Sequence, residues 1–227
     1  MSPPMFDRWL ARPLLLHAAG VWDGQQAWPG FDAWCEQHAG RRCTLWLSTS
    51  MLLELVCPGE LPLADDRAVI EWARPLLQHY HGPAAAGWPL AAWQQGRRRG
   101  VSVLHGTALA ALQASAQRAR VRLAGVRPWW SLVLRRALRR HAELRATQAR
   151  LLVIEVDRLA VLSLEQGRLA GLEVRRLDGP APAALQAWCD DGVPTLAVGY
   201  GLHGKPPAPI NAADTLHGAH PAARWLA

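Results

Sequence analysis

The chain of 227 residues carries a formal net charge of +7, and half of its residues are hydrophobic, which excludes a disordered polypeptide and leaves room for one substantial domain or two small lobes. No run of about 18 apolar residues is present, and the apolar run 14–16 is too short for the core of a secretory signal, so neither a transmembrane helix nor export is expected. These properties predict a cytoplasmic protein.

Short strands alternate with helices through the first half of the chain. The spacing of apolar residues distinguishes strand from helix, and Gly and Pro mark the turns. In chain order, the predicted elements are strands over 14–22 and 25–28, a helix over 31–38, strands over 43–47 and 51–57, a helix over 63–79, strands over 88–94 and 100–105, a helix over 108–118 and a strand over 121–126. The short turn 48–50 predicts that strands 43–47 and 51–57 form a hairpin. Thr107 is expected to cap the helix after it, and Pro75 to kink or split its own helix.

An amphipathic helix is predicted over 129–145, with Pro128 in its first turn. One stripe of this helix is apolar. A second stripe holds four arginines, which are Arg135, Arg136, Arg139 and Arg140. The stretch 151–177, LLVIEVDRLAVLSLEQGRLAGLEVRRL, then predicts three strands joined by tight turns, and a short helix over 182–190 and a strand over 195–200 follow it.

The alternation of strands and helices, together with β-meanders, predicts an α/β protein with mixed sheets. Two parts rich in meanders divide the chain into a first lobe at 12–125 and a second lobe at 126–203. A tail rich in Pro, Gly and His follows at 204–227. No strict sequence repeat relates the two lobes.

The order of these elements resembles the actin-like fold, whose two lobes are ribonuclease-H-like. The segment CTLWLSTSMLLELVCPGELPL with the helix ADDRAVIEWARPLLQHYHG is similar to the opening lobe of the GspL cytoplasmic domain of type II secretion platforms. The junction RVRLAGVRPWWSLVLRRAL is similar to that of actin-like PilM proteins of type IV pilus systems, and the meander 151–177 is the third point of resemblance. The resemblance implies an adaptor, peripheral to the inner membrane, that binds the cytoplasmic segment of an inner-membrane platform protein and also a secretion ATPase.

The resemblance also raises the question of ATP, because PilM relatives bind it whereas the secretion relatives resemble an actin fold without a nucleotide site. In nucleotide-binding relatives the first hairpin reads Asp-x-Gly-Ser/Thr, whose glycine lets backbone N–H groups approach the phosphates. The corresponding stretch here is taken as 155–159, EVDRL, which has neither the glycine nor the hydroxyl. We therefore expect no cofactor, and Glu155 and Asp157 are expected to be solvent-facing or turn acids.

A second glycine-containing stretch, VGYGLHG at 198–204, is expected to be a plain turn after a strand. The alternative is an ATP-binding actin-like pilus assembly protein, in which Mg-ATP would lie near Glu155, Asp157, Gly199 and Gly201.

Arginine and tryptophan supply the candidate partner contacts. The four arginines of helix 129–145 form a solvated basic face or a contact for acidic lipid head groups or an acidic partner segment. Trp88 and Trp93, among twelve tryptophans, are expected to be exposed and to contact a partner. A basic nucleic-acid-associated domain is a further alternative, but the arginine face has no interleaved aromatic residues and no nucleic-acid-binding motif.

The chain has no catalytic or metal-binding motif of the P-loop, GxSxG or HExxH type. Its four cysteines contain no CxxC pair, which disfavours a zinc site and favours buried free thiols. They are Cys35, Cys43, Cys57 and Cys189. His79 and His81 lie at a predicted helix end, where a cation complements the helix dipole. The sequence therefore predicts a non-catalytic, metal-free scaffold.

Overall fold

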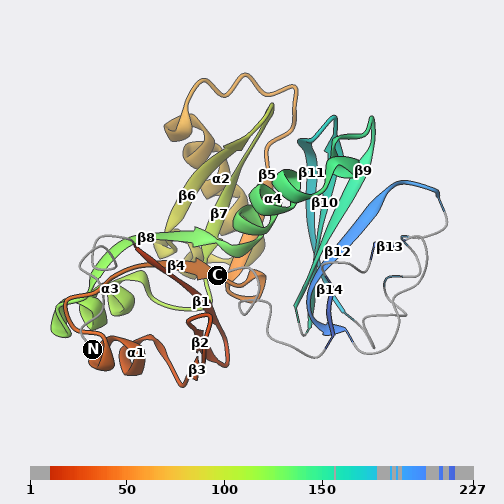
Figure 1. Ribbon diagram of the computed structural model, residues 1–227. Coiled ribbons are helices and arrows are strands. Elements are labelled where there is room, and N and C mark those ends of the chain that lie inside the picture. The colour runs from red at the N-terminus through yellow and green to blue at the C-terminus, as the bar shows by residue number, and fades with distance from the viewer. Residues whose placement is uncertain are drawn as a thin grey trace.

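The computed structural model describes residues 11–155, 157–177, 185, 188, 191–202, 210–211 and 215–217. Within these residues the chain forms three sheets and four α-helices (Figure 1). The helices are α1 Phe31–Gln37, α2 Asp66–His81, α3 Leu109–Arg118 and α4 Trp129–Arg140. No helix in this part of the chain is long and apolar enough to cross a membrane.

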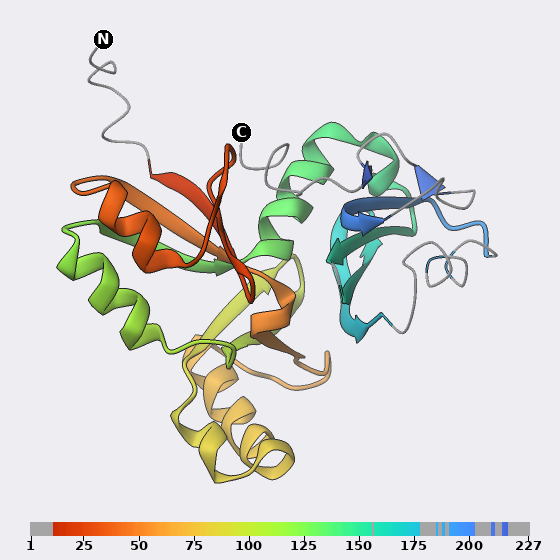
Figure 2. The ribbon, with the colours of Figure 1, turned by 90° about the horizontal axis from the view of Figure 1, so that it is seen from below.

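The first sheet has the strand order β3-β2-β1-β4-β8. Its strands are β1 Arg12–His17, β2 Gly20–Trp22, β3 Ala27–Trp28, β4 Arg42–Leu47 and β8 Arg122–Pro128. The first three strands form an antiparallel meander, and β4 and β8 continue the sheet parallel to β1. Helices α1 and α3 lie together on one face of this sheet (Figure 2). Leu14 and Leu16 face that layer whereas Leu15 faces α4, so the apolar run in β1 is buried on both sides.

The second sheet repeats this topology with the order β11-β10-β9-β12, and β14 pairs with β12. Its strands are β9 Ala149–Glu155, β10 Arg158–Glu165, β11 Arg168–Arg176, β12 Thr195–Leu202, β13 Ile210–Asn211 and β14 Thr215–His217. Again an antiparallel meander comes first, and later strands are added parallel to its first strand. The two sheets therefore share the same strand order and strand directions, although the sequence contains no strict repeat.

Helix α4 lies between the two sheets and packs against both (Figures 1 and 2). Its buried side chains contact Leu15 and Trp46 of the first sheet and Leu151 and Val153 of the second. Because it is covered on two sides, α4 buries more than the single predicted stripe, and Trp129 and Leu132 are buried as well. The predicted helix 129–145 ends earlier, since α4 stops at Arg140 and a 3₁₀ turn, Ala142–Arg145, follows.

A third, three-stranded sheet is inserted between β4 and α3, with the order β5-β7-β6. Its strands are β5 Leu52–Val56, β6 Leu90–Gln95 and β7 Arg98–Leu104. Helix α2 covers this sheet and begins at Asp65, whose carboxylate accepts a hydrogen bond from the Ala68 N–H at 2.8 Å. The insertion has a core of its own, formed by α2 residues such as Val69 and Leu77 with Val101 and Val103 of β7.

Several local predictions are wrong. Strands 43–47 and 51–57 do not form a hairpin, because β4 belongs to the first sheet and β5 to the inserted one. The predicted strand 14–22 is two strands, with a turn at residues 18–19. Thr107 does not cap α3, whose N-cap is Ala108 without a side-chain bond. Pro75 does not split its helix, because α2 continues through it from Asp66 to His81.

The described residues do not cover every prediction. The predicted boundary at residues 125–126 falls inside β8. Most of the predicted helix 182–190 and most of the tail 204–227 lie outside the described residues.

Candidate functional site

The carboxylate of Glu155 lies at the end of β9 and is held by the turn that follows β4. The Thr49 N–H and the Thr49 hydroxyl both donate to Oε1 at 3.0 Å, and the Ser48 hydroxyl donates to Oε2. Glu155 is 2% exposed. Burial raises the pKa of Glu155, while the bonds from Ser48 and Thr49 lower it by a smaller amount. The prediction of a solvent-facing or turn acid is wrong for Glu155, because its carboxylate is buried against Ser48 and Thr49 in the turn after β4.

Gly199 lies in β12, opposite Ile154 of β9, the residue that precedes Glu155. Its φ is +143°, and a Cβ atom there would lie 1.9 Å from the Ile154 carbonyl oxygen. The glycine therefore serves the close approach of two strands. The predicted turn 198–204 is wrong in its first part, because β12 continues to Leu202 and includes Gly201. Asp157 is exposed, with its carboxylate 3.6 Å from Arg158 Nε.

The four arginines of α4 share one side of the helix, as predicted from their spacing. Arg135, Arg139 and Arg140 are exposed and Arg136 is half-buried. Burial and then the neighbouring arginines lower the pKa of Arg136. The Arg135 guanidinium lies 5.8 Å from the centroid of the Trp46 ring, which is a cation–π distance. The structure thus presents a basic face in which Arg135 also has a packing role.

The expectation that Trp88 and Trp93 are exposed is wrong, since both are half-buried. Trp93 meets the Trp130 ring edge-to-face at 5.3 Å. Trp88 lies 5.5 Å from the His81 ring and 5.8 Å from the His105 ring. Part of the surface of both indole rings is therefore covered by other aromatic side chains of the protein and is not accessible to a partner.

A second buried carboxylate, Glu54 of β5, joins the inserted sheet to α4. The indole N–H groups of Trp93 and Trp130 donate to it at 3.1 and 2.8 Å, and the Ser102 hydroxyl lies 2.8 Å from Oε2. Burial raises the pKa of Glu54 to about 7, although these three donors lower it in part. Sequence reasoning missed this network, because nothing in the local pattern of β5 marks Glu54 as buried.

The described cysteines are free, buried thiols, as predicted for Cys35, Cys43 and Cys57. Burial raises the pKa of Cys35 to about 11 and that of Cys43 to about 12, so neither forms a thiolate at neutral pH. Cys189 lies outside the described residues. Within the described part of the chain, no group of three or more His, Cys, Asp or Glu side chains could hold a metal ion.

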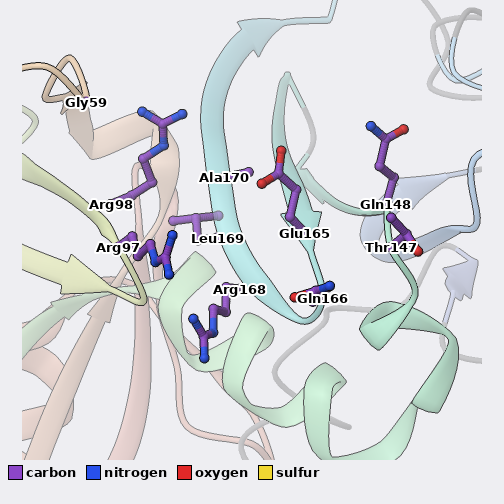
Figure 3. A pocket seen from close by; sticks show the side chains of 10 residues that line it. All are labelled: Gly59, Arg97, Arg98, Thr147, Gln148, Glu165, Gln166, Arg168, Leu169 and Ala170. Carbon is purple, nitrogen blue, oxygen red and sulfur yellow. The ribbon is translucent and has the colours of Figure 1, made fainter.

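An open cavity of about 560 Å³ lies where the inserted sheet approaches the β10–β11 hairpin (Figure 3). Arg97 and Arg98 line one side, and Gln148 and Glu165 line the other. Arg168, at the start of β11, also lines it. Arg97 and Arg98 are neighbours in the sequence, but no local pattern indicates the second wall of the cavity, which comes from residues about 50 to 70 positions later.

No protein-family model matches the chain, and no curated protein sequence matches it. Solved structures do. A Bacteroides thetaiotaomicron protein of actin-like ATPase fold and unknown function matches with a TM-score of 0.56 and 10% identity, over 92% of this chain and 87% of that one. The cytoplasmic domain of EpsL, an inner-membrane component of the Vibrio cholerae type II secretion system, matches with a TM-score of 0.54 and 16% identity, over 94% and 91%.

The fold is actin-like. A PilM–PilN type IV pilus biogenesis complex is also similar, at a TM-score of 0.42 and 14% identity, over 76% of this chain and 55% of that one. The two structures with TM-scores above 0.5 confirm the predicted fold class.

The duplicated topology corrects one detail of the nucleotide comparison. The first hairpin of this actin-like chain is β1–β2, and the stretch 155–159 belongs to the equivalent hairpin of the second lobe, β9–β10. The β1–β2 turn reads His17-Ala18-Ala19-Gly20, without an acid or a hydroxyl. Both hairpins therefore differ from the Asp-x-Gly-Ser/Thr pattern. In the β9–β10 hairpin, both carboxylate oxygens of Glu155 accept hydrogen bonds from protein donors.

Proposed function

We propose that this chain is a non-catalytic adaptor of an inner-membrane assembly platform of the type II secretion or type IV pilus kind. The observation that carries the proposal is the structural match, over nearly the whole chain, to the cytoplasmic domain of an inner-membrane secretion component. The Glu155 contacts support it further, because hydrogen bonds from Ser48 and Thr49 join the first and second sheets directly at the end of β9. On this proposal the protein works in the cytoplasm, at the inner membrane.

The basic face of α4 is the first candidate contact surface for such an adaptor. Arg139 and its exposed neighbours would meet an acidic cytoplasmic segment of the membrane partner, or acidic head groups beside it. A secretion ATPase would bind another face. Trp88 and Trp93 would contribute through the parts of their rings that remain accessible.

The full chain, immobilised and mixed with solubilised inner membranes from the cells that encode it, is expected to recover a platform protein or a secretion ATPase. The charge-reversal variant Arg139→Glu is expected to recover several-fold less of the membrane partner, since the exposed contact of Arg139 to an acidic group is lost and replaced by repulsion. Mass spectrometry of the eluate measures both. Recovery of neither component by the native chain would contradict the proposed function.

Mg-ATP is expected to leave the thermal unfolding of the native chain unchanged. A ligand present at 100 times its dissociation constant adds about 2.7 kcal/mol of stability, which for a protein of this size raises Tm by roughly 5–10 °C. Differential scanning fluorimetry at millimolar Mg-ATP, with Mg-AMP as the matched control, measures this. A rise of that size with ATP alone would instead favour the ATP-binding alternative.

A further inference from the structure

The arginine-lined cavity is built by two hairpin turns that come from different sheets. Arg97 lies in the turn between β6 and β7, Arg98 begins β7, and Arg168 begins β11. The two turns touch, since a Cβ atom on Gly96 would lie 3.2 Å from the Arg168 Cβ. Tertiary contact thus brings Arg97, Arg98 and Arg168 to the lining of one open cleft, although they come from different sheets.

In the part of the chain that the structure describes, these three arginines have no acidic partner. Within the described residues, Arg97, Arg98 and Arg168 form no side-chain hydrogen bond or ion pair. The adjacent Arg99 shows the contrast, because its guanidinium donates to the Leu63 carbonyl at 2.7 Å and to Gln94. The N–H groups of Arg99 are therefore used in hydrogen bonds within the protein, whereas those of the other three arginines are available to bind an anion.

The opposite wall decides which kind of anion fits. Glu165 lines the same cavity and makes no ion pair within the described residues. A dense polyphosphate filling the cleft would bring several negative charges against this carboxylate, which is unfavourable. An extended peptide can place negative charge at the arginines and hydrogen-bond donors at the opposite wall. Its side-chain carboxylates would face the arginines, and its backbone N–H groups would face Glu165 and Gln148.

The backbone beside the arginines also suits an extended peptide. Leu169 and Ala170 line the cleft, and they belong to β11, which is an edge strand of the second sheet as far as the structure describes it. An edge strand offers unpaired backbone groups to which an extended segment can add as a further strand. The cleft therefore offers main-chain hydrogen bonding and positive charge side by side.

We propose that this cleft binds an extended acidic peptide segment of a protein partner. The proposal names a contact site for the adaptor function proposed above and rests on it for the identity of the partner, but its chemistry can be tested with a peptide alone. The α4 arginine face is a separate surface, so loss of binding at one does not imply loss at the other.

The test is fluorescence anisotropy with the full chain and a labelled peptide in which glutamates alternate with serines. The native protein is expected to bind this peptide more tightly than a matched peptide with glutamine in place of glutamate, and less tightly as salt is raised. The variant Arg97→Glu with Arg168→Glu is expected to bind at least about a hundredfold more weakly, about tenfold for each arginine. The variant Arg42→Glu with Arg122→Glu changes net charge equally at exposed positions of the first sheet and is expected to lose only a few-fold.

A variant that binds more tightly separates an effect on the cleft from misfolding, because a misfolded protein would lose affinity rather than gain it. Glu165→Gln removes a repulsive charge but keeps an acceptor oxygen, so it is expected to strengthen binding of the glutamate peptide a few-fold. Equal binding of the two peptides, or equal losses in the two arginine variants, would overturn the proposal. Tighter binding of tripolyphosphate than of the glutamate peptide would overturn it in favour of a phosphate site. Recovery of a platform protein from membranes alongside failure of these peptide tests would reject this cleft while leaving the adaptor function standing.

Discussion

Replacing Glu155 with alanine is expected to lower the free energy of unfolding by about 3 kcal/mol. The substitution leaves three buried donors without their acceptor, which are the Ser48 hydroxyl, the Thr49 hydroxyl and the Thr49 N–H. Each unpaired donor costs about 1 kcal/mol or more. Because the donors and the acceptor come from different lobes, hydrogen exchange at the Thr49 amide is expected to accelerate together with the loss measured by urea unfolding.

Glutamine at position 155 provides the matched control. Its oxygen can accept both bonds from Thr49, and its NH₂ group can donate to the Ser48 oxygen, so a loss below about 1 kcal/mol is expected. Asp157→Ala removes a neighbouring exposed acid and is expected to change stability by less than about 0.5 kcal/mol. If alanine at 155 proved as harmless as these two, Glu155 would not join the lobes, and a ligand-binding role for it would regain support.

The sequence predicted the elements of this fold better than it predicted their partners. Apolar period and turn residues placed the meander 151–177 within about two residues of β9, β10 and β11. Local pattern also identified the amphipathic face of α4. The local pattern could not show that β4 pairs with β1 and β8 rather than with β5, the next strand in the sequence. Strand pairing across an insertion depends on which faces are buried against distant residues, and a short stretch of sequence does not contain that information.

The same limit explains the errors at the candidate site. Glu155 reads as an exposed acid because glutamate is rarely buried, and the donors that permit its burial lie 106 and 107 residues earlier. Trp93 likewise reads as an exposed aromatic residue, although Glu54 and Trp130 hold it from other elements. Only a signal that links distant positions could have found these contacts.

Buried carboxylates join the three parts of this molecule. Glu155 connects the second sheet to the first, and Glu54 connects the inserted sheet to α4, which itself packs between the two large sheets. A protein that used its inter-lobe space for nucleotide turnover would need that space to open and close. Here the carboxylates of Glu155 and Glu54 accept hydrogen bonds from protein donors across each junction, an arrangement that opposes such opening.

The Glu54 junction is expected to make stability fall as pH rises. Below about pH 4.5 the carboxyl is protonated in both the folded and the unfolded states. Between about pH 4.5 and pH 7 the unfolded chain releases this proton while the folded protein, whose Glu54 pKa is about 7, retains it. Rising pH therefore favours unfolding across this window, and above about pH 7 the penalty is constant, at about 3 kcal/mol.

Glu54→Gln is expected to remove this dependence. Glutamine cannot ionise, although its NH₂ group faces a donor and costs a constant amount at every pH. Urea unfolding from about pH 4 to about pH 8 should therefore show the variant gaining about 3 kcal/mol relative to the native chain as pH rises. Burial also raises the pKa of Glu155, which adds a slope of the same sign, but this slope is common to both proteins and cancels in the difference. Glu71→Gln, at an exposed position of α2, is expected to run parallel to the native chain. Parallel behaviour of Glu54→Gln would contradict the prediction, because it would show that the pKa of Glu54 is the same in the folded and unfolded states.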